Sequence, residues 1–225
     1  MMNLMQHRLF TDCGTNDGAV PDGGALAVLG QLDPDIATAL ATYGPPPDRS
    51  LPASFDTLAR AIVGQQVSRH AATAIWAKMD HHGVTDPALI VTKTPDELMQ
   101  SGLSRRKAEY LIGIADEIIS GRLDLAALAQ LPGPDIQARL TQIRGIGAWT
   151  ADNYRLFALA DMDAWPVNDI AIQEGMRLLK SLDTRPNASE LAALGEAWRP
   201  VRGAGALVLW HIYGILVRKA TVADI

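Results

Sequence analysis

The residues best suited to chemistry lie at a short glycine turn and at a carboxylate that follows it. The turn Arg144-Gly145-Ile146-Gly147 separates two stretches whose apolar residues recur at helical spacing. Glycine gives a turn access to positive φ and lets another backbone come close. The first backbone N–H groups of the second helix have no intrahelical partner, so they form a binding site for an anion such as a phosphate.

Asp169 is the candidate carboxylate. It ends the segment Pro166-Val167-Asn168-Asp169, where a further helical pattern begins that runs to Lys180. With Asn168 as the N-cap, Asp169 falls in the first helical turn, where the helix dipole favours the ionised form. An ionised carboxylate can stabilise positive charge that develops on a sugar and can orient an attacking water. Taken alone, the position also fits an aspartate that only completes a helix cap.

Two further segments could face a nucleic acid. Gly64-Gln65-Gln66-Val67-Ser68 interrupts a helical pattern, and a glycine inside a helix costs about 1 kcal/mol relative to alanine. Ser104 is expected to cap a helix that runs to about Ser120 and begins with Arg105-Arg106-Lys107. Cations at the positive end of a helix dipole are unfavourable unless an anion lies opposite. An ordinary helix corner and a solvated basic turn stay open as alternatives.

Together these segments resemble a known family. GQQVS (64–68), GLSRRK (102–107), GIGAWTA (145–151) and PVND (166–169) occur in the order found in the helix-hairpin-helix DNA glycosylases, and the chain is most similar to the 3-methyladenine DNA glycosylase II branch. The resemblance covers roughly residues 54 to 219. It implies an all-α, two-lobed helix-hairpin-helix glycosylase fold with the active site in the cleft between the lobes. The N-terminal β domain of larger relatives is expected to be absent, because residues 1–50 show neither its length nor its alternation.

The resemblance also implies roles for individual residues. Asp169 is the implied catalytic carboxylate, and Gln66 is the residue implied to fill the gap left by an extruded base. The implied substrate pocket comprises Gln65, Trp149, Tyr154 and Trp210. The residues implied to bind DNA are Arg144, Gly145, Ile146, Gly147, Thr150, Gln66, Arg105, Arg106 and Lys107. The hairpin of this family can also hold a monovalent cation through backbone carbonyls.

The subtype follows from the residue at Trp149. Family members that also cut the DNA backbone use a lysine at this place as a Schiff-base nucleophile. Here no lysine lies between Lys107 and Lys180. The expected enzyme is therefore a monofunctional DNA-3-methyladenine glycosylase that hydrolyses the N-glycosidic bond of alkylated purines and leaves an abasic site. An aromatic wall attracts a cationic base by about 1–2 kcal/mol.

Two departures from the family pattern affect these expectations. Arg144 stands where the family usually has proline, which removes a rigid φ and adds a possible phosphate contact. Asn153 stands where a better-known relative has tyrosine, while Tyr154 lies one place on. The exact wall of the pocket, and with it the range of alkylated bases, is therefore open.

Composition narrows the class of protein. The chain has 225 residues, a net charge of −5 and a single cysteine, Cys13. One cysteine allows no internal disulfide and no iron–sulfur cluster held by four cysteines of this chain. The histidines form no ligand set, so neither a metal nor a cofactor is expected. The acidic total is unusual for a protein that binds DNA, whose phosphates are usually neutralised by lysine and arginine, so any DNA surface must be local.

The elements expected to position these residues are helices throughout. Helix starts are expected at Asp33-Pro34, Ser54, Ser68, Thr94 and Ser104. Residues 1–50 are expected to form an N-terminal extension, loosely ordered over 1–24, and residues 51–225 the helical glycosylase core with its hairpin at 140–159. The longest apolar run is too short to span a membrane, and no secretory signal is evident. We expect a monomer in the cytoplasm, or at the nucleoid in a bacterium, acting on double-stranded DNA with alkylated bases.

Three alternatives stay open on the sequence. A non-catalytic helix-hairpin-helix protein that binds DNA or senses damage would bind duplex without releasing a base. A glycosylase for oxidised bases or mismatched adenine is disfavoured by the absent cluster cysteines and the absent lysine. A helical interaction module unrelated to DNA would leave the turn at Gly145 and the basic turn at Arg105 without a purpose.

Overall fold

The computed structural model describes residues 23–217, and this part of the chain is helical, with no strand. The expected all-α class is thus confirmed, and within these residues there is no β domain. The helices are α1 (Gly23–Leu32), α2 (Pro34–Tyr43), α3 (Phe55–Val63), α4 (Arg69–His81), α5 (Pro87–Ile90), α6 (Pro95–Met99), α7 (Arg105–Ile119), α8 (Leu125–Leu128), α9 (Gly133–Thr141), α10 (Ala148–Ala158), α11 (Ile170–Leu179), α12 (Ala188–Gly195), the 3-10 helix η2 (Glu196–Trp198) and α13 (Arg202–Leu216).

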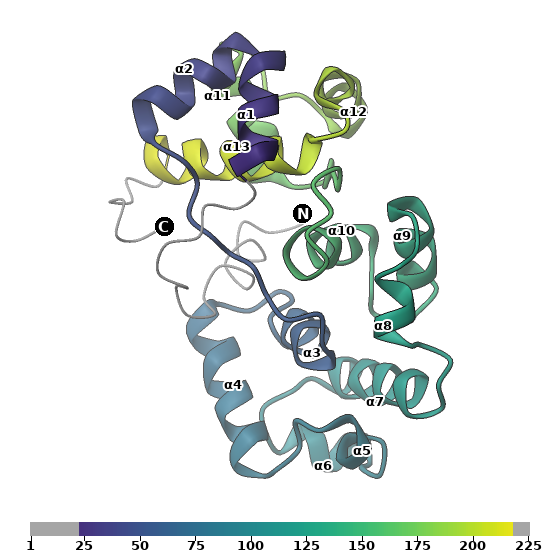
Figure 1. Cartoon of the computed structure of the whole chain (residues 1–225). Coiled ribbons are helices and arrows are strands. Elements are labelled where there is room, and N and C mark those ends of the chain that lie inside the picture. Colours follow the sequence, from purple (N-terminus) through teal and green to yellow (C-terminus); the bar gives the residue numbers. More distant parts are fainter. Residues whose placement is uncertain (1–22, 218–225) are drawn as a thin grey trace.

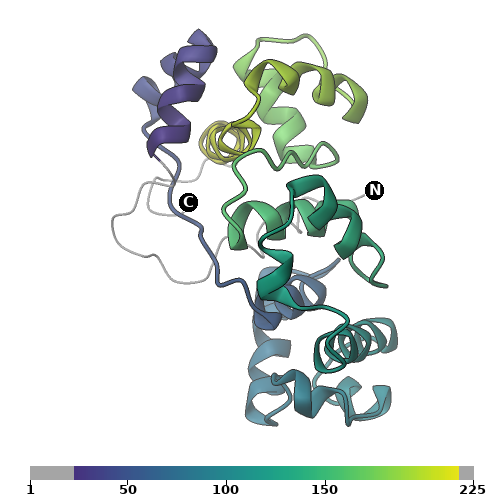
Figure 2. The same cartoon turned by 45° about the vertical axis from the view of Figure 1, so that its right-hand side comes forward.

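The side chains form two hydrophobic clusters, which define two lobes (Figures 1 and 2). The first lobe consists of α1, α2, α11, α12, η2 and α13, and the second of α3 to α9. Helix α10 belongs to both, since its residues Trp149 and Phe157 join the first cluster while Ala151 and Tyr154 join the second. The hairpin helix therefore lies where the lobes meet.

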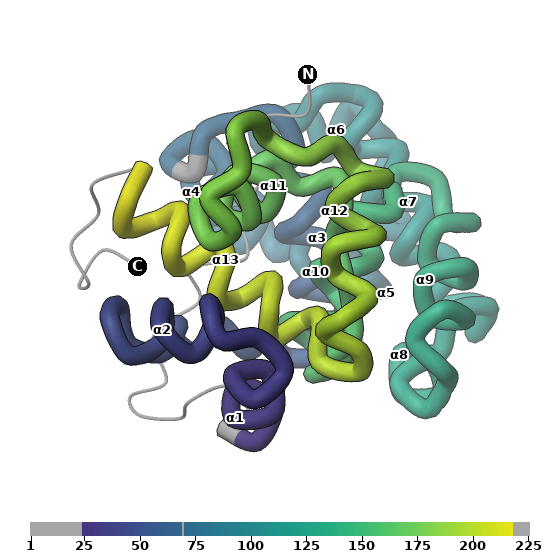
Figure 3. Tube along the Cα trace, turned by 90° about the horizontal axis from the view of Figure 1, so that it is seen from above, coloured from purple at the N-terminus to yellow at the C-terminus, as the bar shows by residue number. Residues whose placement is uncertain are grey.

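Segments from both ends of the described chain build the first lobe. Helix α13 packs against α11 on one side and against α1 and α2 on another, as the view from above shows (Figure 3). The buried carboxylate of Asp33 links the N-terminal segment to the C-terminal one. It accepts hydrogen bonds from Trp198 Nε1 at 2.7 Å and from Lys180 Nζ at 2.7 Å. Residues 23–43 thus share one core with the C-terminal helices.

Helix α1 was not predicted, because residues 1–24 were expected to be loosely ordered. Residues 1–22 lie outside the described part of the chain. The segment Gly23–Leu32 starts with two glycines and carries no acidic residue in its first turn. Its stability comes from tertiary packing: Ala25, Leu26 and Leu29 are buried in the first cluster. Burial of this kind outweighs weak local propensity for a short helix.

The predicted helix starts are confirmed by their capping hydrogen bonds. The side chains of Asp33, Ser54, Ser68 and Ser104 each accept a backbone N–H from the turn that follows. Thr94 forms a full capping box with Glu97. These local signals were readable because the polar side chain satisfies an N–H group that the helix leaves unpaired.

Candidate active site

The hairpin consists of α9, the turn at residues 142–147 and α10. Gly145 has φ +101°, and a Cβ placed on it would lie 2.5 Å from the ring of Tyr110. Gly147 has φ −91°, and a Cβ there would meet nothing within 4 Å. The two glycines therefore differ: Gly145 is required by its φ and by Tyr110, whereas Gly147 leaves open space at the start of α10.

The start of α10 offers backbone N–H groups to a ligand. In the part of the chain that the structure describes, no side chain caps this helix, and Gly147 is exposed. Ile146, between the glycines, is only 4% exposed and anchors the turn in the second lobe. An exposed, uncapped helix start carries partial positive charge and can receive a phosphate.

Asp169 is buried at the start of α11 and is held by four N–H donors. Its Oδ1 accepts from the backbone N of Ala171 at 2.8 Å and of Ile172 at 3.0 Å, and from Trp210 Nε1 at 3.2 Å. Its Oδ2 accepts from Trp149 Nε1 at 2.7 Å. Asp169 is itself the N-cap of α11, so the expectation that Asn168 caps this helix is wrong by one residue. From the cap position, an aspartate accepts the N–H groups of the first turn that the helix leaves unpaired.

Two opposing influences act on the Asp169 carboxyl group. Burial raises its pKa above the usual value, while the hydrogen bonds from Trp149, Ile172, Trp210 and Ala171 act in the opposite direction. All four donors favour the charged form, because a carboxylate only accepts hydrogen bonds. In its ionised form, this carboxylate places a negative charge in surroundings of low polarity, where its field on a nearby cation is strong.

Trp149 and Trp210 hold the carboxylate by their indole N–H groups. Trp149 is 7% exposed and Trp210 is 1% exposed, and the ring of Trp210 stacks on Phe157 at a centroid distance of 5.5 Å. The sequence suggested these tryptophans as aromatic walls, and the hydrogen bonds to Asp169 could not be read from it. The structure does bring both tryptophans to Asp169.

The other two expected pocket residues do not join them. Tyr154 is fully buried in the second cluster, on the opposite side of α10 from Trp149. Gln65 is half-buried, and its Nε2 donates to the carbonyl oxygen of Gly145 at 3.0 Å. Gln65 therefore contacts the hairpin rather than the tryptophans.

The loop between α3 and α4 carries Gln66 in an unusual conformation. Gln66 has φ +58° and is exposed. Positive φ in a residue other than glycine is uncommon and often marks a functional site. Thr150, expected to bind DNA, is only 3% exposed, so its side chain is buried rather than presented to a ligand.

The expected cations differ in their surroundings. Arg105 is exposed and pairs with Asp96, and Arg106 is exposed with no ion pair among residues 23–217. Arg144 is exposed, 3.5 Å from Glu109 and above the ring of Tyr110. Lys107 is half-buried: burial lowers its pKa, and its Nζ donates to the carbonyl oxygen of Val63 at 2.7 Å.

Tyr110 is a part of the site that the sequence did not reveal. It lies directly under Gly145 and under the guanidinium of Arg144. No motif marks it, because its contribution depends on how α7 packs beside the hairpin. Its ring packs against the glycine turn and so sets the distance between this turn and α7.

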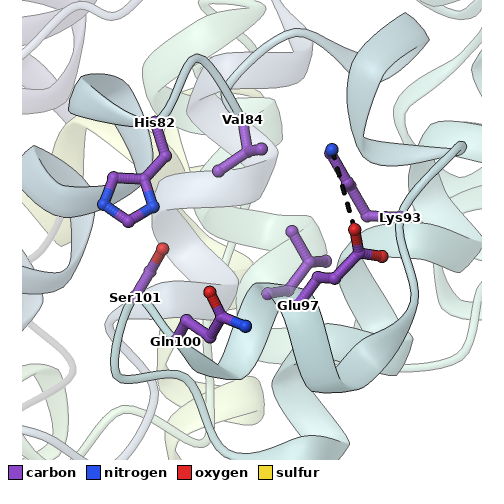
Figure 4. A pocket seen from close by; sticks show the side chains of 7 residues that line it. His82, Val84, Lys93, Glu97, Gln100 and Ser101 are labelled. Carbon is purple, nitrogen blue, oxygen red and sulfur yellow. Dashed lines mark ion pairs between the residues drawn. The ribbon is translucent and has the colours of Figure 1, made fainter.

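A separate cavity of about 230 Å³ lies in the second lobe (Figure 4). It is lined by His82, Val84, Lys93, Glu97, Leu98, Gln100 and Ser101. Two of these residues, Lys93 and Glu97, form an ion pair with a separation of 3.8 Å. None of these residues belongs to the hairpin or to the helices that hold Asp169.

Residues 23–217 contain no cluster of three or more histidine, cysteine, aspartate or glutamate side chains that could hold a metal ion. Among the helices of this range, none is long and apolar enough to cross a membrane.

Comparison with known proteins places this geometry in a family. Residues 59–200 match the family described as HhH-GPD superfamily base excision DNA repair protein. DNA-3-methyladenine glycosylase 1 of Schizosaccharomyces pombe is 32% identical over 171 residues, which cover 73% of this chain and 75% of that protein. The chain spans 58% of the length of each of two Bacillus subtilis relatives that it matches.

Two solved structures resemble the whole described fold. The DNA-3-methyladenine glycosidase of Bacillus halodurans superposes with a TM-score of 0.81 at 27% identity, covering 92% of this chain and 97% of that one. The 3-methyladenine DNA glycosylase of Schizosaccharomyces pombe, in complex with abasic DNA, superposes with a TM-score of 0.73 at 30% identity, covering 83% and 95%. With the family match over residues 59–200, which includes both the hairpin and Asp169, the chain belongs to the HhH-GPD superfamily of base excision DNA repair proteins.

Proposed function

We propose that this protein is a monofunctional DNA glycosylase that removes alkylated purines of the 3-methyladenine and 7-methylguanine type and leaves an abasic site. The observation that carries the proposal is the buried carboxylate of Asp169, held by Trp149, Trp210 and two backbone N–H groups beside the hairpin helix. The names of the relatives, DNA-3-methyladenine glycosylases in two kingdoms, support the substrate class.

The hairpin is the part of the protein that binds the DNA backbone in this proposal. The uncapped start of α10 and the open space at Gly147 let a phosphate approach the backbone N–H groups. Arg144 in the hairpin turn and Arg106 in the first turn of α7 are exposed and add positive charge. The target base must leave the stack before its glycosidic bond can be reached, and Gln66 is the side chain proposed to fill the gap.

Asp169 then acts on the sugar. As the bond to the base breaks, positive charge develops on the sugar ring, and a buried carboxylate stabilises it at close range. The same carboxylate can orient the water that attacks the sugar. An alkylated purine carries positive charge before cleavage and leaves easily, so the enzyme needs no strong general acid.

The proposal includes the absence of a lyase step. Trp149 occupies the position at which a lysine would form a Schiff base, and its indole N–H is committed to Asp169. Hydrolysis by Asp169 requires no cofactor, although a monovalent cation at the hairpin carbonyls fits the same proposal. The partner is double-stranded DNA with alkylated bases, bound by a monomer in the compartment that holds the chromosome.

The test is base release from duplex DNA treated with a methylating agent. We expect free 3-methyladenine and 7-methylguanine, and strand breaks only after alkali has opened the abasic sites. Strand cleavage without alkali, together with a covalent complex trapped by borohydride, would contradict the monofunctional assignment. Duplex binding without any base release would favour the alternative of a non-catalytic damage-binding protein.

A further inference from the structure

Residues 64–68, here named the Gln66 loop, join α3 to α4 and hold Gln66 at φ +58°. A residue other than glycine in this region costs about 1–3 kcal/mol and persists only when its surroundings enforce it. The loop must therefore be fixed by contacts at its sides. Two such contacts are present. They are made by Lys107 and Gln65, for which the family resemblance implied other roles.

The first contact fixes the start of the loop. Lys107, in the first turn of α7, donates from Nζ to the carbonyl oxygen of Val63 at 2.7 Å. Val63 is the last residue of α3, and a cation at the C-terminal end of a helix is favoured by its dipole. The Lys107 side chain is half-buried, so the ammonium group faces the protein rather than solvent.

The second contact fixes the loop to the hairpin. Gln65, directly before Gln66, donates from Nε2 to the carbonyl oxygen of Gly145 at 3.0 Å. Gly145 is itself seated on the ring of Tyr110, which belongs to α7. The Gln66 loop, the hairpin turn and the first half of α7 are thus joined in one closed set of contacts.

We propose that Lys107 and Gln65 are positioning residues that hold the Gln66 loop between α7 and the hairpin, so that Gln66 meets DNA in a preset conformation. This inference rests on the proposed function. It differs from the roles implied by the sequence, in which Lys107 neutralises a phosphate and Gln65 lines the base pocket. When the hairpin binds a phosphate, the Gln66 loop therefore keeps a fixed position relative to the hairpin.

The two roles of Lys107 predict different effects of Lys107→Met. A cation that neutralises a phosphate contributes about 0.9 to the slope of log affinity against log salt. A positioning lysine leaves this slope unchanged and instead slows base release from the bound complex. Arg106→Met, on the same helical turn, serves as the comparison for a phosphate-type cation. Lys78→Met removes an exposed charge from α4, outside the site, and serves as the control for charge alone.

The experiment measures three quantities for the full chain with each variant. These are the salt slope of binding to a duplex that carries an abasic analogue, the single-turnover rate of 7-methylguanine release at saturating protein, and amide hydrogen exchange of the peptide that spans residues 62–68. Lys107→Met should slow release by about tenfold or more, the effect of losing a hydrogen bond to a charged group, and should speed exchange in that peptide. Its salt slope should equal that of wild type, whereas Arg106→Met should lower the slope. Lys107→Arg should restore part of the lost rate.

A lowered salt slope for Lys107→Met, with release and exchange as in Lys78→Met, would overturn the proposal. Gln65→Met, which keeps the length of the side chain and removes its donor, supplies a second test if Lys107→Met fails to fold. It should also slow release and speed exchange over residues 62–68, and unchanged values of both would contradict the proposal. If wild type releases no base, the proposed function fails, and hydrogen exchange still decides whether Lys107 and Gln65 hold the loop.

Discussion

Trp149 Nε1 donates a hydrogen bond of 2.7 Å to Asp169 Oδ2, across 20 positions of sequence and between two helices. Trp149 lies in the first turn of α10, directly after the hairpin glycines, and Asp169 caps α11. One helix therefore exposes the N–H groups that we propose contact DNA and also holds the carboxylate that we propose is catalytic. In the proposed function, α10 thus determines both the contact with the DNA backbone and the position of the carboxylate.

Loss of this hydrogen bond should slow base release. Trp149→Phe keeps an aromatic ring but removes the N–H donor, and we expect the single-turnover rate to fall by about 10- to 100-fold, because a hydrogen bond to a charged group contributes about 1.5–3 kcal/mol. Trp165→Phe is the matched control: its Nε1 donates at 3.2 Å to the backbone of Leu191, away from Asp169. It should lower stability without slowing release by the folded protein. Equal rate losses in both variants would show that the effect is structural.

As the pH is lowered, activity should begin to fall at a higher pH than the ordinary pKa of an aspartate would give. Burial raises the pKa of Asp169 above the ordinary value of 3.8, and the reaction needs the ionised form. As the pH falls through this raised pKa, the carboxylate is protonated and release slows. The measurement is the rate of base release against pH on pre-methylated DNA. A rate that stays constant down to pH values near 4 would contradict a buried catalytic carboxylate.

The two hairpin glycines should respond in opposite ways to alanine. Gly145→Ala places a Cβ 2.5 Å from the Tyr110 ring at φ +101°, and should lower the free energy of unfolding by about 2 kcal/mol or more. Gly147→Ala meets no atom within 4 Å and should change stability by less than about 1 kcal/mol. It should nevertheless weaken duplex binding, because its methyl group stands where a phosphate approaches. Denaturant unfolding and DNA titration of both variants check this; intact affinity in Gly147→Ala would argue against the hairpin as the DNA contact.

Asp152 should give the stability a distinctive pH dependence. It accepts from Arg155 at 2.8 Å and from Gln137 at 2.7 Å, which joins α10 to α9, and burial raises its pKa to about 6 from 3.8. Between these values the folded state binds more protons than the unfolded state, so this group's contribution to stability falls as the pH rises. Relative to Asp152→Asn, wild type should lose up to about 3 kcal/mol between pH 4 and 6 and then stay level. If wild type instead gains stability relative to Asp152→Asn as the pH rises, then Arg155 keeps the pKa of this carboxyl group low.

Local signals in the sequence predicted much of this structure. The caps at Ser54, Ser68 and Ser104 were readable because each satisfies N–H groups within a few residues. The hairpin was predicted from residue type and spacing, whereas the role of Asp169 was implied by the resemblance of these segments to a known family. The hydrogen bonds of Trp149 and Gln65, by contrast, join residues far apart in the chain and depend on the angle at which helices pack. Helix α1 was missed for the same reason, since its buried residues pack against α13 and η2, far away in the sequence, as well as against α2.

Asp169→Asn separates the proposed catalytic role of this carboxylate from its role as a helix cap. The variant keeps an oxygen that can accept from the backbone N–H groups of Ala171 and Ile172, so α11 should stay capped and the protein should still bind an abasic duplex. We expect wild type to free 3-methyladenine from methylated DNA, and Asp169→Asn to bind with similar affinity and free little or none. Base release by Asp169→Asn at the rate of wild type would instead show that the buried carboxylate takes no part in the reaction.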